Sequence, residues 1–94
     1  MLKEEGFSEE ETWIHLTEDE RRVLIQVYKF QAKRNFRYGL NKHYIKGVGN
    51  VDKVIDSLKK KGLVFTITPY KNKEKYVYVF LTRKGRETVC KNLD

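Results

Sequence analysis

The fold is decided by residues 50–85, which read NVDKVIDSLKKKGLVFTITPYKNKEKYVYVFLTRKG. At the start of this stretch the apolar residues recur at i, i+3, i+4 and i+7, which is the spacing of one face of a helix. Asn50 is a good N-cap, and Gly62 stands where helices usually end. The spacing therefore predicts a helix over residues 50–61.

A β-hairpin is predicted over residues 63–82, because this segment is rich in β-branched and aromatic side chains. Successive side chains of its second strand should point to opposite faces of the hairpin, which gives two sets of apolar side chains. One face would carry Val77, Val79 and Leu81, and the other Tyr76, Tyr78 and Phe80. A hairpin in water normally leaves one face polar, so we expect another element or a second subunit to cover the aromatic face. Residues 83–93 predict a last short helix.

Upstream of residue 50 the sequence predicts further helices. They are an acidic extension with a short helix over 1–16, a core-facing helix over 17–34, and a short helix over 40–47. Ser8 and Thr17 each begin a capping-box pattern, in which a hydroxyl caps a free N–H and a glutamate three residues later reaches back. Glycines at 47 and 49 favour a tight turn into the helix at 50–61. The whole chain of 94 residues is predicted to be one α+β domain.

The charge is divided unevenly along the chain. The net charge is +7, yet residues 1–20 hold one lysine and eight acids, so the remaining 74 residues carry +14. Such a basic body attracts polyanions, although exposed lysines also serve solubility alone. No apolar run approaches a membrane span, and the first residues lack the pattern of a signal peptide. We therefore expect a cytoplasmic protein, in the host cytoplasm if the source is a virus.

Catalysis is not expected. His15, His43 and Cys90 do not have metal-ligand spacing, and the sequence contains neither a glycine-rich phosphate loop nor an evident nucleophile-base pair. We predict no enzyme, metal or cofactor. Cys90 is interpreted as a small half-buried side chain on the last helix, or as a disulfide partner for the same residue of a second chain.

The face of the 50–61 helix opposite its apolar stripe contains Lys53, Asp56 and Lys60, with Asp52 and Ser57 at its sides. Lysine can reach a guanine edge or a phosphate, serine adapts to several partners, and an aspartate can accept from a cytosine amino group. The alternative is an ordinary solvated face, on which Asp56 and Lys60 form an i, i+4 pair.

The predicted nucleic-acid contacts are polar or charged residues of this helix, of the short helix before it, of the hairpin tip and of the start of the last helix. They are Lys42, Lys46, Asn50, Lys53, Asp56, Ser57, Lys60, Lys71, Lys73, Lys75 and Arg83. The lysines of the tip would follow a phosphate backbone or enter a minor groove, and the alternative is again a solvated tip.

These elements together resemble the winged helix-turn-helix core of MarR-like transcription regulators. The resemblance is carried by the helix order, by Lys-Lys-Gly-Leu-Val at 60–64 and by Leu-Thr-Arg-Lys-Gly at 81–85, and it covers residues 16–92. It implies a repressor or activator that binds double-stranded DNA, usually as a homodimer on a pseudo-palindrome. The helix at 50–61 would read the major groove, and the wing at 69–75 would contact the backbone or the minor groove.

Two departures from that family shape the expectations. The long terminal helices that form its dimer and ligand pocket have no counterpart in the sequence, so we do not expect a small-molecule effector. The wing tip carries lysines where the family commonly has an Asp and Arg pair, and the length resembles that of small archaeal and archaeal-virus regulators. The predicted dimer contacts are Trp13, Tyr76, Tyr78, Phe80 and Cys90. The alternative function is a winged-helix module that binds proteins and reads no bases.

Overall fold

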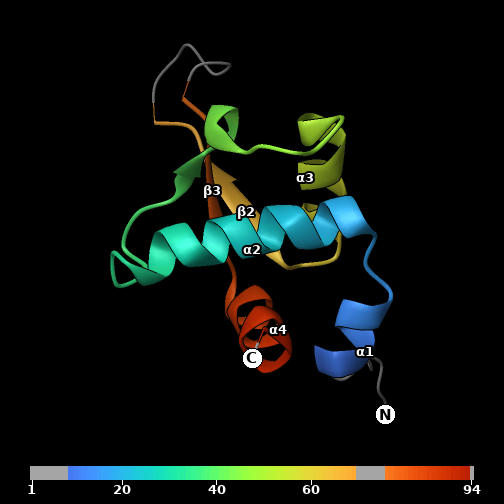
Figure 1. Ribbon diagram of the computed structural model, residues 1–94. Coiled ribbons are helices and arrows are strands. Elements are labelled where there is room, and N and C mark those ends of the chain that lie inside the picture. Colours follow the sequence, from blue (N-terminus) through green and yellow to red (C-terminus); the bar gives the residue numbers. More distant parts are fainter. Residues whose placement is uncertain (1–8, 70–75, 94) are drawn as a thin grey trace.

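The computed structural model describes residues 9–69 and 76–93 of the protein (Figure 1). In chain order the elements are α1 (Glu9–Ile14), α2 (Glu18–Ala32), β1 (Leu40–Asn41), a 3-10 turn (Lys42–Tyr44), α3 (Val51–Lys60), β2 (Val64–Ile67), β3 (Tyr78–Leu81) and α4 (Arg83–Asn92). The predicted α+β class is confirmed, as are the helices expected over 17–34, 50–61 and 83–93.

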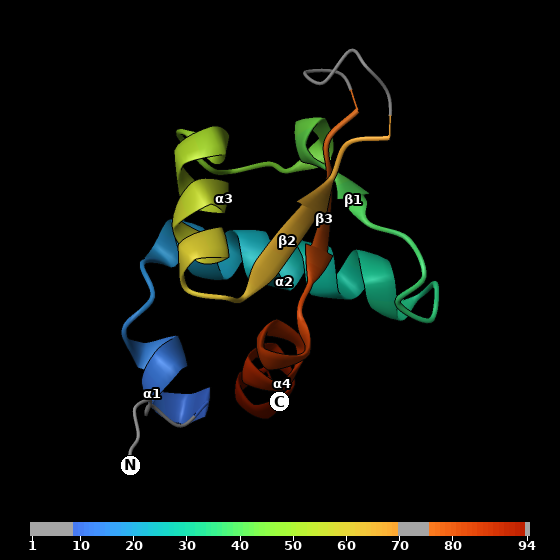
Figure 2. The same ribbon diagram turned by 180° about the vertical axis from the view of Figure 1, so that it is seen from behind.

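The sheet has three antiparallel strands in the order β1-β3-β2. Its register pairs Leu40 with Val79 and Phe65 with Phe80. The long helix α2 crosses one face of the sheet (Figures 1 and 2). Helix α3 lies beside β2 and also contacts α2. Helix α1 packs against α4 at one end of the molecule (Figure 1). The predicted hairpin is therefore present, and β1 adds a third strand to it.

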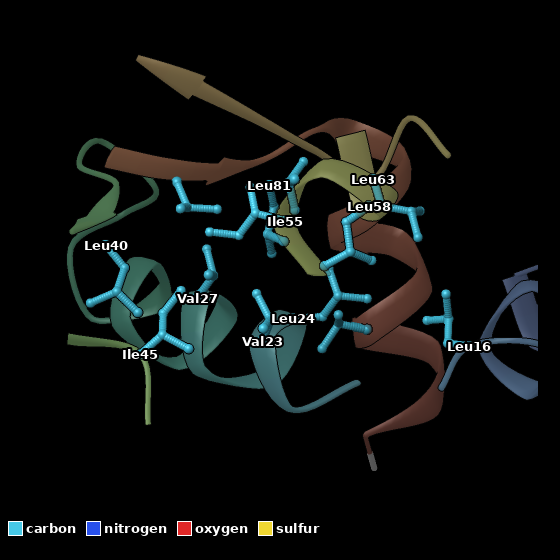
Figure 3. Packing of buried hydrophobic residues seen from close by; sticks show 13 residues of the cluster. Leu16, Val23, Leu24, Val27, Leu40, Ile45, Ile55, Leu58, Leu63 and Leu81 are labelled. Atoms are coloured by element: carbon cyan, nitrogen blue, oxygen red, sulfur yellow. The ribbon is translucent and has the colours of Figure 1, made fainter. Parts of the chain in front are cut away.

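The core lies between α2, α3 and the inner face of the sheet (Figure 3). Its buried apolar residues are Leu16, Val23, Leu24, Val27, Leu40, Ile45, Ile55, Leu58, Leu63, Val64, Val79, Leu81 and Val89. Val79 and Leu81 are buried while Phe80 between them is not, which confirms the alternation expected for the second strand. The apolar stripe of α3 also faces inward as its spacing predicts, with Ile55 and Leu58 buried.

The two helix ends that the sequence marks most clearly have the expected geometry. Thr17 caps α2 by accepting from the Glu20 N–H at 3.1 Å, and the Glu20 carboxylate accepts from the Thr17 N–H at 2.8 Å. After α3, Gly62 adopts a φ of 76°, which favours glycine, and the Leu63 N–H donates to the Leu58 carbonyl at 3.0 Å. This turn directs the chain into β2. The other predicted capping residue, Ser8, lies outside the described residues.

The helix predicted over 40–47 is wrong. Leu40 pairs with β3, and the Lys42 N–H donates to the Val77 carbonyl at 2.9 Å, so these backbone groups serve the sheet and not a helix. Only one 3-10 turn follows. After it, the Gln26 side chain accepts from the Lys46 N–H at 2.9 Å and donates to the Lys46 carbonyl at 2.7 Å. Pairing with distant residues has overridden the local apolar spacing. The chain therefore does not form two full helices joined by a tight turn.

Close packing at Gly85 gives a test of this fold. A Cβ atom added there would lie 2.1 Å from the Leu63 carbonyl oxygen, whereas one added at Gly49 would meet nothing within 4 Å. We expect Gly85→Ala to lower the free energy of unfolding by at least about 2 kcal/mol, because the backbone of α4 and that of Leu63, just before β2, must separate. Gly49→Ala should change it by less than about 1 kcal/mol. Urea unfolding followed by circular dichroism measures both, and equal stabilities would contradict this packing.

Candidate nucleic-acid interface

Helix α3 presents a polar face to solvent. Its outward positions are all exposed, and they are Asp52, Lys53, Asp56, Lys59 and Lys60. The opposite face is fixed in the core through Ile55 and Leu58. The predicted orientation of Lys53, Asp56 and Lys60 is therefore observed, and Lys59 joins them.

The lysines of this face differ in how far their charge is neutralised. Lys60 lies 3.4 Å from Asp56 in the i, i+4 pair that the sequence suggests, with both side chains more than half exposed. Such exposed pairs contribute little, so the lysine can exchange this partner for another anion. Lys53 and Lys59 have no carboxylate within ion-pair distance among the residues that the structure describes. These two ammonium groups are the most available cations of α3.

The start of α3 is organised by two polar contacts. Asn50 is the N-cap and accepts from the Lys53 N–H at 3.1 Å, as expected of a good capping residue. Lys42 donates to Asp52 at 2.7 Å, and only 16% of the Lys42 side chain is exposed. Lys42 therefore does not offer the exposed cation that its predicted nucleic-acid contact requires, because its ammonium group lies against the first turn of α3 and compensates Asp52. Lys42 holds this end of α3 in place.

Ser57 is also placed differently from the prediction. Its hydroxyl donates to Glu20 Oε2 at 2.6 Å, and the Lys61 ammonium donates to both oxygens of the same carboxylate, at 3.0 and 2.8 Å. The Ser57 hydroxyl is therefore bound to α2, and it does not lie free beside the outward face as its predicted nucleic-acid contact requires. Ser57 and Lys61 instead join the end of α3 to the start of α2.

The Glu20 carboxylate at this contact is almost fully buried, with 4% of its side chain exposed. Burial alone raises the pKa of Glu20, but hydrogen bonds from Lys61, Ser57 and the Thr17 N–H outweigh that effect, helped by the positive charge of Lys61. The pKa of Glu20 therefore lies below its ordinary value of 4.5. The carboxylate is ionised at neutral pH and binds three groups from two helices.

The remaining predicted contacts do not form one cluster. Lys46 is exposed in the loop before α3, where Gln26 and its backbone bonds hold the chain. Arg83 begins α4, which follows the end of β3, and 92% of its side chain is exposed (Figure 1). Lys71, Lys73 and Lys75 lie outside the described residues. The structure thus gathers Lys53, Asp56 and Lys60 on the outward face of α3, whereas Lys46 lies in the loop before α3 and Arg83 at the start of α4.

The predicted dimer contacts occupy three different places. Trp13 is half-buried, packs on the core and has the Arg21 guanidinium 5.5 Å from its ring centre. Cys90 is an exposed free thiol on α4, so its expected half-burial is not observed. The other three residues, Tyr76, Tyr78 and Phe80, lie on or beside β3. No single surface unites all five.

Residues that the sequence reasoning missed act mainly as supports. Glu20 is recognisable as a capping residue, but its bonds to Ser57 and Lys61 span 37 and 41 positions of the chain and leave no local pattern. The amphipathic spacing of α3 could have included Lys59, which neighbours Lys60 on the same exposed surface. Tyr44 lies in the 3-10 turn that stands in place of the predicted 40–47 helix, and it is 67% exposed.

Other classes of site are not indicated by the described part of the chain. Within residues 9–69 and 76–93, no three His, Cys, Asp or Glu side chains are grouped so that they could hold a metal ion. In the same ranges no helix has the length and apolar character needed to cross a membrane. Comparisons with protein-family models, curated proteins and solved structures found no match.

The lowered pKa of Glu20 predicts how stability depends on pH. A carboxyl whose pKa is lower in the folded state stabilises the protein above its ordinary pKa of 4.5, and this contribution is lost as the pH falls through the folded value. We expect Glu20→Gln to lower the free energy of unfolding by about 1–3 kcal/mol at neutral pH, since it weakens the bonds to Ser57 and Lys61. As the pH falls from 4.5 through the lower pKa of the folded state, the wild type and the variant should converge.

Glu18→Gln is the matched control for this experiment, because Glu18 stands in the same first turn of α2 but has a side chain that is 79% exposed. Its stability should stay within about 0.5 kcal/mol of the wild type at every pH. Urea unfolding across the pH range provides the measurement. A difference between wild type and Glu20→Gln that does not change with pH would contradict the role given to the ionised carboxylate.

Proposed function

We propose that the protein is a transcription regulator that binds double-stranded DNA as a homodimer, with α3 in the major groove. Residues 69–75 of the wing would contact the backbone or the minor groove. The observation that carries the proposal is the outward face of α3, on which Lys53, Lys59 and Lys60 are all exposed while the opposite face is buried. A major groove accommodates one α-helix, and lysines reach both phosphates and guanine edges.

The support beneath α3 suits this role. Glu20 joins its last turn to α2, Lys42 binds its first turn, and Gln26 holds the loop that leads into it. Base recognition requires side chains on an element whose position is fixed before binding. Both ends of α3 are fixed in this way.

The order of elements is compatible with a winged helix. A helix, a short strand, a second helix and a hairpin follow one another, and the short strand pairs with the second strand of the hairpin. The helix that would precede α3 in such a fold is reduced to the turn at Lys42–Tyr44. We infer that the bonds from α2 replace the support that this missing helix would provide.

The start of α3 and the turn Lys42–Tyr44 lie at the end of the molecule away from α1 and α4 (Figure 1). These two helices therefore leave the start of α3 accessible to a duplex.

The salt dependence of duplex binding tests the proposal. Each lysine that neutralises a phosphate should contribute a slope of about −0.9 to the plot of log affinity against log salt concentration. We expect a slope of about −5, for roughly six contacts, in fluorescence anisotropy on a random duplex. A flat response would remove the DNA proposal and favour the protein-binding module.

Two pairs of substitutions separate base recognition from phosphate binding. Lys53→Ala with Asp56→Ala leaves the net charge unchanged, so it should reduce the preference between duplex sequences while preserving the salt slope. Lys71→Ala with Lys73→Ala should weaken binding to all duplexes alike and make the slope shallower by about 2.

Lys29→Ala with Lys33→Ala is the control for the second pair, because it removes the same charge from exposed positions at the end of α2. Anisotropy on a panel of duplexes measures all three variants. If the pair on α3 weakens every duplex equally, α3 does not read bases.

A further inference from the structure

The face of the sheet that points away from the core is apolar. The register places Phe65 opposite Phe80 and Ile67 opposite Tyr78, with these side chains on the outer surface. Phe65 is 43% exposed and Ile67 is 45% exposed. In Figure 2 the strands lie in front of α2, and no described helix crosses this side of them. We call this surface, made of Phe65, Ile67, Tyr76, Tyr78 and Phe80, the outer sheet face.

The rings of the outer sheet face are ordered. Phe65 and Phe80 stack with ring centres 5.1 Å apart and ring planes 10° from parallel. The Phe80 ring also covers Gly39, where an added Cβ would lie 2.6 Å from its Cε1 atom. These aromatic side chains are held in place before any partner binds, so association costs little side-chain entropy.

The same strands carry no charge. None of the residues of β1, β2 and β3 is Asp, Glu, Lys or Arg, although 35% of the whole chain is charged. An antiparallel sheet with one face in water normally carries polar residues there, so an uncharged aromatic face indicates a surface that a partner covers.

The absence of charge on these strands also indicates which kind of partner covers the outer sheet face. Aromatic surfaces that stack single-stranded nucleic acid are accompanied by basic side chains along the backbone path, and the described strands supply none. A second copy of this chain has the opposite requirement, because two molecules with a net charge of +7 repel each other wherever their lysines meet. The outer sheet face lets two copies approach without that repulsion.

We propose that the outer sheet face is the homodimer interface, with Phe65, Ile67 and Phe80 at its centre. Two sheets packed face to face lie about 10 Å apart, with their strands within about 30° of each other. A two-fold axis along the strands keeps the starts of both α3 helices at one end of the dimer. This choice of axis rests on the proposed DNA binding, whereas the interface itself does not.

Two exposed isoleucines provide the test. Ile67→Lys places like charges opposite each other in the interface, while Ile14→Lys makes the same change on α1, where Ile14 is 66% exposed. Sedimentation equilibrium without DNA, at micromolar protein, should show a dimer for the wild type and for Ile14→Lys. The dissociation constant of Ile67→Lys should rise at least about tenfold. Phe65→Thr, which retains a strand-forming residue, should weaken the dimer in the same direction.

Three results would overturn the interface: a monomeric wild type, an Ile67→Lys variant as dimeric as the wild type, or dissociation by Ile14→Lys alone. Circular dichroism melting confirms that each variant is folded before it is compared. The DNA proposal is tested separately, by the slope of log affinity against log salt concentration for duplex DNA. A monomer with a steep slope contradicts only the interface, and a dimer with a flat slope contradicts only DNA binding.

Discussion

The contact between the Glu20 carboxylate and the end of α3 is the interaction on which the arrangement of this molecule most depends. It joins the first turn of α2 to residues 37 and 41 positions further along the chain, and it does so inside a nearly buried site. Removing the Lys61 ammonium would leave the buried Glu20 charge less compensated, although solvent reduces the cost because 42% of the Lys61 side chain is exposed. Together with the burial of Ile55 and Leu58, this contact fixes the direction of α3 and the side on which its lysines lie.

Helix α2 extends the same principle along its length. Near its other end, the buried Gln31 accepts from the Leu81 N–H of β3 at 2.9 Å, and in its middle Gln26 holds the backbone of Lys46. Polar side chains on one helix thus attach α3, the loop before α3, and the sheet. Apolar packing brings these elements together, but it is less directional than hydrogen bonds and tolerates small shifts. The polar contacts of α2 set the relative positions that a rigid binding surface needs.

Much of the fold could be predicted because its signals are local. The capping box at Thr17 and the apolar spacing of α3 depend on residues within one or two helical turns. The alternation around Val79 depends on adjacent residues of one strand. The strand and turn after residue 39 could not be predicted, because the backbone groups there bond to β3 and to Gln26. The same distinction holds for the candidate site. The outward position of Lys53 and Lys60 follows from helix geometry, whereas Ser57 and Lys42 bind Glu20 and Asp52, partners that local patterns do not reveal.

The distribution of charge separates two surfaces that composition alone does not distinguish. A body with +14 over residues 21–94 would bind polyanions anywhere if its lysines were spread evenly. Instead, the strands are uncharged, and α3 carries exposed lysines on its outward face. The DNA and the second copy of the chain that we propose as partners would therefore favour different sides, because the DNA would bind near the lysines and the second copy would avoid them. Dimerisation through the outer sheet face would leave the lysines of α3 accessible, so the two proposed partners do not compete for one surface.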